Sequence, residues 1–137
     1  MAAWNAKVEQ ILRQPAGLDD GFSAEDIARE ANTDFSKLST WEIVCEEVLD
    51  TTFPRIHYQR AREELLRRGI AETEIEELRR VAWQTAGWLN FEKQLWDWTS
   101  LDEKDLTRAI EWQYRERWIT TERRRQLLTF VIQHTCR

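Results

Sequence analysis

Four carboxylates between residues 42 and 50 are the first side chains in this sequence whose types and spacing could do chemistry. They are Glu42, Glu46, Glu47 and Asp50. Side chains three or four positions apart on a helix lie on one face, so Glu46 and Asp50 would come together there, with Glu47 near them. Carboxylate oxygens are the ligands that Mg²⁺ prefers. The run would therefore suit metal-dependent hydrolysis.

The Glu46-Glu47-x-x-Asp50 run resembles half of the metal site of the all-α nucleotide pyrophosphohydrolases, over five residues. That site needs a second acidic pair on a partner helix, and residues 102–105 would offer one at a helix start. The apolar stripe within residues 41–49 favours another interpretation, in which the carboxylates form the solvated face of an amphipathic helix. Metal-dependent hydrolysis is the second alternative.

Histidine and cysteine chemistry has little support in the sequence. His57 and His134 belong to no Glu-x-x-His or His-x-x-x-His motif, and Cys45 and Cys136 have no metal or redox spacing. No nucleophile-elbow, phosphate-loop or dinucleotide motif occurs in the sequence. We therefore expect no cofactor and no bound metal, favour a non-catalytic role, and interpret the cysteines as reduced thiols of a cytoplasmic protein.

Arginine and tryptophan gather toward the C-terminus. Residues 1–103 carry 12 Lys and Arg against 21 Asp and Glu, a net charge of −9, whereas residues 104–137 carry 8 against 4, a net charge of +4. Tryptophan and arginine dominate protein-binding hot spots, and they also hold single-stranded nucleic acid. Local ion pairs on a solvated face are the third interpretation. The predicted partner-binding residues are Trp88, Trp96, Trp98, Trp112, Arg115, Trp118, Arg123 and Arg124.

The tryptophans between residues 83 and 98 face several directions if this stretch is helical. Trp83, Trp88, Trp96 and Trp98 cannot all pack on one side. Either this helix is central and surrounded by its own chain, or a partner covers one of its faces.

Residues 24–44 resemble a helix-turn-helix unit, with Ala28 at the small position and Asn32 where glycine is usual. Asn can adopt the same left-handed turn. Glu42 and Glu46 would face the phosphates, however, and a recognition helix normally presents Lys and Arg. A DNA-reading regulator is therefore a less favoured alternative than ordinary helix packing.

The elements that must position these residues are helices. Glycine and proline are scarce, at 4 and 2 residues, and no alternating strand pattern occurs in the sequence. We predict one all-α domain over residues 1–137, a bundle of six or seven helices with a long central helix near residues 73–98. Expected boundaries are a cap at Ser23 with Asp26 reaching back, a start after Ser39 or Thr40, Pro54 and Gly69 around a fourth helix, a cap at Ser100 or Asp102, and a cap at Thr120 or Thr121.

The sequence thus favours a non-catalytic protein-interaction module, an adaptor, assembly subunit or protein inhibitor. Its expected partner is another protein or a second copy of itself. Association with nucleic acid is the first alternative. No apolar run approaches the roughly 18 residues of a membrane span, and no secretory signal is recognisable. We therefore expect a cytoplasmic protein with no membrane partner.

Overall fold

The computed structural model describes residues 2–49, 51–93 and 101–135 of the chain. These residues form seven α-helices, one 3-10 helix (η1) and one π-helix (η2), with no strand among them, so the predicted all-α fold is confirmed. The elements are α1 (Ala2–Leu12), α2 (Ala24–Ala31), α3 (Thr40–Val44), η1 (Cys45–Val48), α4 (Arg55–Arg67), α5 (Glu72–Ala82), η2 (Trp83–Glu92), α6 (Glu103–Arg115) and α7 (Thr121–Thr135).

Helix starts follow the local capping signals. Ser23 Oγ accepts a hydrogen bond from Asp26 N at 3.0 Å, and Ser23 N donates to Asp26 Oδ2 at 3.2 Å, which is the predicted capping box. Ser39 and Asp102 cap α3 and α6 in the same way. Each box satisfies backbone N–H groups that a helix start would otherwise leave without partners.

The long central helix predicted near residues 73–98 is helical through residue 92, but it is not a regular α-helix throughout. It is continuous from α5 through η2, but residues 83–92 form a π-helix, and residues 94–98 lie outside the described part of the chain. Thr85 Oγ1 donates to Val81 O at 2.7 Å. That hydrogen bond competes for the carbonyl that the Thr85 amide would use in an α-helix, and such bonds bend helices.

The π-helix η2 lies at the centre of the fold and packs against α1, α5, α6 and η1. Buried side chains from other elements bind its backbone. Trp4 Nε1 donates to Trp83 O at 3.0 Å, and Gln113 Nε2 donates to Gln84 O at 2.7 Å. Trp83 and Trp88 are both buried by this chain itself. For these two tryptophans, the central-helix alternative is therefore the one observed.

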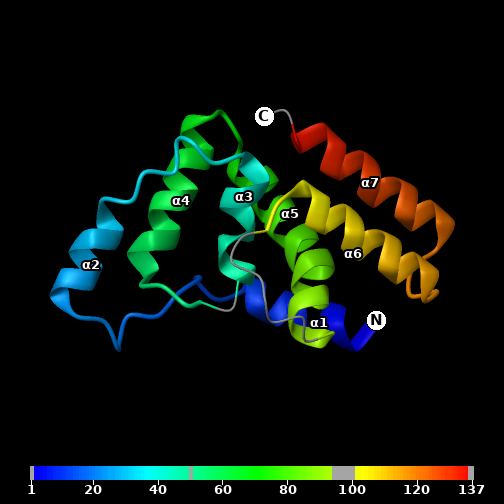
Figure 1. Cartoon of the computed structure of the whole chain (residues 1–137), viewed down its shortest axis with the longest axis horizontal. Coiled ribbons are helices and arrows are strands. Elements are labelled where there is room, and N and C mark those ends of the chain that lie inside the picture. Colours follow the sequence, from blue (N-terminus) through cyan, green and yellow to red (C-terminus); the bar gives the residue numbers. More distant parts are fainter. Residues whose placement is uncertain (1, 50, 94–100, 136–137) are drawn as a thin grey trace.

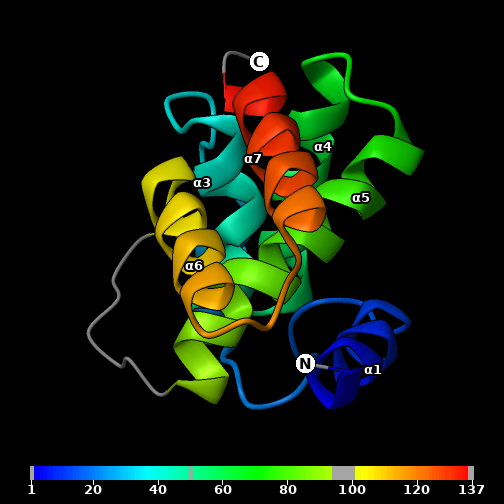
Figure 2. The same ribbon diagram turned by 90° about the vertical axis from the view of Figure 1, so that its right-hand side faces the viewer.

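The molecule is elongated, and two regions lie at opposite ends of its long axis (Figure 1). One end holds α2, which packs against α4. The other end holds the turn between α6 and α7, two helices that run side by side in both views (Figures 1 and 2). No helix in the described residues combines the length and apolarity needed to cross a membrane.

Two large apolar side chains on helices are exposed. Ile27 on α2 is 40% exposed and Ile132 on α7 is 69% exposed. α2 has a neighbour on one side, whereas α7 buries Leu127, Val131 and His134 and turns the next position outward. The apolar face of each of these helices is therefore wider than the surface that the fold covers.

Candidate functional site

Three of the predicted tryptophans meet at the junction of η2 and α6. The ring centroid of Trp88 lies 6.5 Å from that of Trp112 and 6.3 Å from that of Trp118, both in edge-on arrangements. Lys93 Nζ lies 5.3 Å from the centroid of the Trp88 ring, a cation–π contact. We call Trp88, Trp112, Trp118, Lys93 and Glu116 the tryptophan cluster.

Glu116 fixes the orientation of this cluster. Its carboxylate accepts hydrogen bonds from Trp112 Nε1 and Trp118 Nε1, both at 2.8 Å, and from Lys93 Nζ. The bond from Lys93, followed by those from the two indoles, lowers the pKa of Glu116 to about 2. The carboxylate therefore stays charged at neutral pH and holds both rings.

The cluster is buried at one edge and open at the other. Trp88 is 1% exposed, whereas Trp118 is 42% exposed. Arg115 and Arg117, both exposed, flank Trp118 in the sequence. The result is a large, oriented aromatic ring beside cations at the surface, a combination enriched in protein-binding hot spots.

The backbone presents Trp118 through a strained helix end. Trp118 N donates to Gln113 O at 2.9 Å and Arg117 N donates to Tyr114 O at 3.0 Å, the two bonds of a Schellman motif. This motif places its penultimate residue in the left-handed region, and Arg117 has φ 62° there. Glycine is usual at that position because other residues pay a steric cost. Strain of this kind often marks functional surfaces.

The other predicted arginines lie on the first turns of α7 and are engaged by their own chain. Arg124 pairs with Glu111 at 2.7 Å, and Arg123 Nη2 donates to Gln84 Oε1 at 3.1 Å. Trp96 and Trp98 lie outside the described residues. The structure thus brings six of the eight predicted residues to the α6–α7 end and η2, and their binding role stays a prediction.

The opposite end of the molecule is acidic. Residues 18–34 carry six Asp and Glu against one Arg, a net charge of −5. Leu18 and Ile27 in this segment are exposed large apolar side chains. Backbone hydrogen bonds from Leu18 N to Phe53 O and from Arg55 N to Leu18 O hold the start of the segment. We call residues 18–34 the acidic end and residues 115–125 the basic end.

Sequence reasoning missed a buried histidine site that ties α2 to the rest of the fold. His57 Nδ1 lies 2.8 Å from Glu30 Oε2, and Nε2 lies 3.8 Å from Glu46 Oε1. The Phe53 ring stacks on the imidazole at 4.1 Å. Burial lowers the pKa of His57, and burial, with Glu30 nearby, raises the pKa of Glu46 to about 7. No local motif signals this site, because its members come together only in the fold.

The described carboxylates of the run at residues 42–50 make contacts within the fold. Glu42 closes the capping box of α3, and Glu47 pairs with Arg79 at 2.6 Å. Asp50 lies outside the described residues. Within the described ranges, no three His, Cys, Asp or Glu side chains are grouped so that they could hold a metal ion.

The helix-turn-helix comparison meets a geometric difficulty. The helix α3, which would read the DNA, has five residues, and Thr40, Trp41, Ile43 and Val44 are buried. The helix α2 packs against α4. In addition, α3 contains no Lys or Arg that could contact phosphates.

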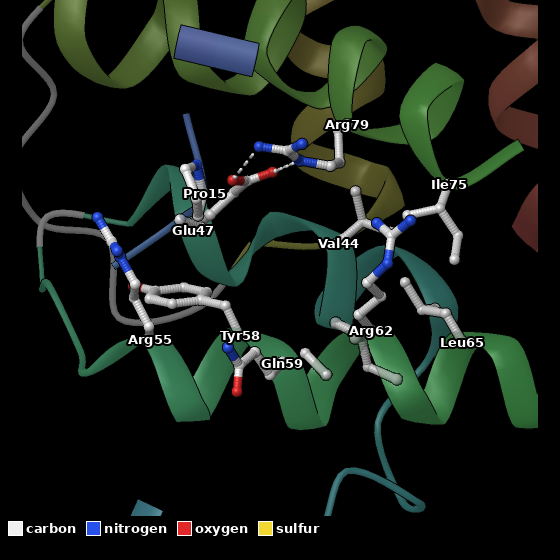
Figure 3. A pocket seen from close by; sticks show the side chains of 13 residues that line it. Pro15, Val44, Glu47, Arg55, Tyr58, Gln59, Arg62, Leu65, Ile75 and Arg79 are labelled. Atoms are coloured by element: carbon white, nitrogen blue, oxygen red, sulfur yellow. Dashed lines mark hydrogen bonds and ion pairs between the residues drawn. The ribbon is translucent and has the colours of Figure 1, made fainter. Parts of the chain in front are cut away.

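A pocket of about 210 Å³ lies between α3, α4 and α5 (Figure 3), and no residue of the tryptophan cluster lines it. Val44, Leu65 and Ile75 give it apolar walls, and Arg55 and Arg62 from α4 also line it. No sequence motif predicted it, since its lining comes from four separate segments.

Comparison of this chain with protein-family models, with curated proteins and with solved structures finds no match.

Proposed function

We propose that this chain is a non-catalytic protein-interaction module, an assembly subunit that associates head to tail with copies of itself. In this proposal the basic end of one copy, centred on Trp118, docks on the acidic end of the next. We place the protein in the cytoplasm in this proposal, because the buried free thiol of Cys45 would stay reduced there.

The observation that carries the proposal is the exposed, oriented ring of Trp118. Glu116 and Trp88 fix the ring before any partner arrives. A rigid aromatic side chain loses little conformational entropy on binding, so it contributes strongly to affinity. Arg117 takes the left-handed conformation at a position where glycine is usual, so the helix end that presents Trp118 carries a steric cost.

Charge complementarity selects a second copy as the occupant. Residues 115–125 carry five Arg against two Glu, a net charge of +3, whereas the acidic end carries −5. Leu18 and Ile27 at the acidic end offer exposed apolar surface for Trp118. Because the two ends lie at opposite poles of the long axis (Figure 1), such a contact would be heterologous and would repeat from copy to copy.

Sedimentation velocity at several protein and salt concentrations tests the proposal. We expect the sedimentation coefficient to rise with protein concentration at low salt and to fall as salt screens the contact. Trp118→Ser should return the protein to a monomer. The matched control is Ile132→Ser, which removes an even more exposed apolar side chain from α7 outside the basic end and should leave assembly unchanged.

Two outcomes would contradict this function. One is a monomer at every protein and salt concentration. The other is assembly that Trp118→Ser and Ile132→Ser weaken equally, which would indicate unspecific apolar contact. A gel-shift titration with single-stranded RNA and DNA addresses the nucleic-acid alternative. A shift that depends on Arg115 and Arg117, in a chain that stays monomeric, would replace assembly by nucleic-acid binding.

A further inference from the structure

A buried cluster of three titratable side chains joins α2 to the rest of the fold. Glu30 comes from α2, His57 from α4 and Glu46 from η1, and their side chains are 13%, 5% and 19% exposed. Within the described ranges, the bond between Glu30 and His57 is the one side-chain hydrogen bond between α2 and α4. No residue of α2 is buried, so this cluster carries much of the attachment of a helix that lies at one end of the molecule (Figure 1).

The hydrogen bond to Glu30 determines which nitrogen of His57 carries the proton. Nδ1 lies 2.8 Å from Glu30 Oε2, and an ionised carboxylate can only accept a hydrogen bond. Nδ1 of the neutral ring is therefore protonated, and Nε2 carries a lone pair. Nε2 is buried and has no hydrogen-bond partner in the part of the chain that the structure describes. The rings of Phe35 and Phe53 contact the imidazole and limit the access of water.

Glu46 faces this lone pair from the opposite side of the ring. Its Oε1 lies 3.8 Å from His57 Nε2, so a protonated carboxyl group donates to Nε2 after an approach of about 1 Å. An ionised Glu46 instead turns negative charge toward the lone pair. The contact between Glu46 and His57 is therefore favourable when the two side chains share one additional proton, and unfavourable when they do not.

Carboxylates outnumber cations around Glu46. Burial is the largest cause of its shifted pKa, followed by Glu30 from α2 and Glu42 from α3, and together they raise the pKa of Glu46 to about 7. Its neighbour Glu47 in η1 is already paired with Arg79 from α5. Glu46 therefore exchanges its proton with solvent near neutral pH.

The other polar side chains at the cluster do not neutralise a second carboxylate. Arg29 Nε lies 3.8 Å from Glu30 Oε1, but the Arg29 side chain is largely exposed, so water screens this pair. Tyr58 contacts the imidazole, and burial raises the pKa of Tyr58 to about 12, so the phenol stays neutral. Loss of the shared proton thus leaves two carboxylates on either side of a neutral ring.

The helix α2 delivers the side chain that increases the proton affinity of the other two. Burial lowers the pKa of His57, whereas the hydrogen bond and the charge of Glu30 act to raise it. The charge of Glu30 also contributes to the raised pKa of Glu46. Coupling between two binding events is reciprocal. A proton on Glu46 or on His57 Nε2 therefore strengthens the contact that brings Glu30 to them.

We propose that Glu30, His57 and Glu46 form a proton-controlled latch that holds α2 on α4. The latch is closed while Glu46 and His57 share the additional proton. When that proton leaves to solvent, Glu30 and Glu46 repel each other across the ring, and the release of α2 takes Glu30 into water. An isolated helix of eight residues is too short to be stable, so α2 unfolds when it is released.

The latch would regulate the acidic end, because α2 lies within residues 18–34. A closed latch fixes the carboxylates and Ile27 of α2 in one arrangement, and an open latch leaves them without one. This consequence rests on the proposed assembly, whereas the latch itself does not. The latch can therefore be tested in a chain that does not assemble.

Hydrogen exchange of residues 24–32, followed by mass spectrometry in the Trp118→Ser chain, measures the attachment of α2. Protection factors correct for the change of intrinsic exchange with pH. The protection of α2 should fall by roughly threefold or more between pH 5 and pH 8, because the closed state binds the proton more tightly than the open state. The protection of α4 should stay constant.

Three variants separate the latch from a general loss of stability. Glu30→Gln removes the charge that α2 delivers and should abolish the pH dependence. The matched control Glu25→Gln, at an exposed carboxylate of the same helix, should keep it. Glu46→Gln carries a neutral amide that can donate to His57 Nε2. It should raise the protection of α2 at pH 8 to the level that the unsubstituted cluster shows at pH 5, which a merely destabilising substitution cannot do.

Nitrogen NMR spectra test the protonation of the ring directly, since the chain has only two histidines. At pH 8, His57 should carry its proton on Nδ1. The inference is overturned if that proton is on Nε2, if protection is independent of pH or rises with it, or if Glu46→Gln and Glu25→Gln behave alike. Sedimentation decides none of these outcomes, so the latch and the assembly can fail independently.

Discussion

The C-terminal ends of α4 and α6 share one hydrogen-bonded motif and differ in the residues that complete it. At α4, Gly69 takes the left-handed position with φ 85°, and Ile70 N donates to Leu65 O at 3.2 Å. Ile70 then enters the core, 1% exposed. At α6, Arg117 takes the left-handed position, and Trp118 stays half-exposed.

The end of α4 packs into the core, whereas the end of α6 presents its apolar residue to solvent. Glycine adopts positive φ without steric cost, and the apolar residue after it normally packs back on its own helix. Both features hold at α4. At α6 the strained residue is an arginine and the apolar residue is a tryptophan whose exposed part meets solvent. The comparison predicts that substitutions at α4 change stability, whereas substitutions at α6 change assembly.

The largest expected effect on stability is at the α4 end. Ile70→Ala should lower the free energy of unfolding by about 2 to 4 kcal/mol, because it removes buried apolar volume and leaves a cavity. Trp118→Ala should cost about half as much, since part of that ring is already in water. Urea unfolding of both variants measures the two changes. Equal losses of unfolding free energy in the two variants would contradict the distinction between the ends of α4 and α6.

The largest expected effect on association is at the α6 end. Trp118→Ala should weaken self-association by about 2 kcal/mol or more, roughly thirtyfold, as expected for a hot-spot tryptophan. Ile70→Ala should leave the association constant unchanged wherever the protein is folded. Sedimentation equilibrium, with folding checked by circular dichroism, gives both constants. A stronger effect from Ile70 would reverse the assignment of the two ends.

Substitutions at the two left-handed positions, Gly69 and Arg117, should change the free energy of unfolding in opposite directions. Gly69→Ala should cost about 1 kcal/mol, purely from the backbone, since no atom lies within 4 Å of an added Cβ. Arg117→Gly should raise stability by about 0.5 to 1 kcal/mol, because glycine relieves the strain. Thermal and urea unfolding measure these changes. A loss of stability in Arg117→Gly would show that the arginine side chain stabilises the fold.

The smallest effect concerns pH at the α6 end. The pKa of Glu116 falls from 4.5 to about 2 on folding, with Lys93 as the largest cause. A carboxyl group with a lowered pKa in the folded state stabilises above its unfolded pKa and loses that contribution as pH falls through its folded pKa. The contribution should therefore fade between about pH 4.5 and pH 2. Glu116→Gln should flatten the pH dependence of unfolding in that window, and an unchanged slope would contradict the role of Glu116.

Local signals in the sequence were sufficient for most helix boundaries. Ser23 with Asp26 predicted a capping box, and Gly69 predicted the end of α4, because both features depend on neighbouring residues in the chain. The predicted cluster at the basic end also includes Trp118, the most exposed described tryptophan. Composition and periodicity predict these features because they reflect local backbone geometry and which face of a helix is apolar.

Long-range contacts explain what the sequence did not reveal. The backbone of the π-helix η2 accepts hydrogen bonds from Trp4 and Gln113, which are distant in the sequence. His57 meets Glu30 across 27 positions, so no spacing rule predicts the pair. The left-handed Arg117 carried no signal either, because glycine or asparagine usually marks that conformation.

The most direct test of head-to-tail assembly mixes two variants that each block one end. Trp118→Ser blocks the basic end, and Asp20→Lys with Glu25→Lys blocks the acidic end at two exposed carboxylates. Light scattering coupled to size exclusion should find each variant monomeric alone. An equimolar mixture should contain dimers and no larger species. The intact acidic end of one variant binds the intact basic end of the other, and both remaining ends are blocked. A mixture that stays monomeric, or that forms longer oligomers, would contradict this account.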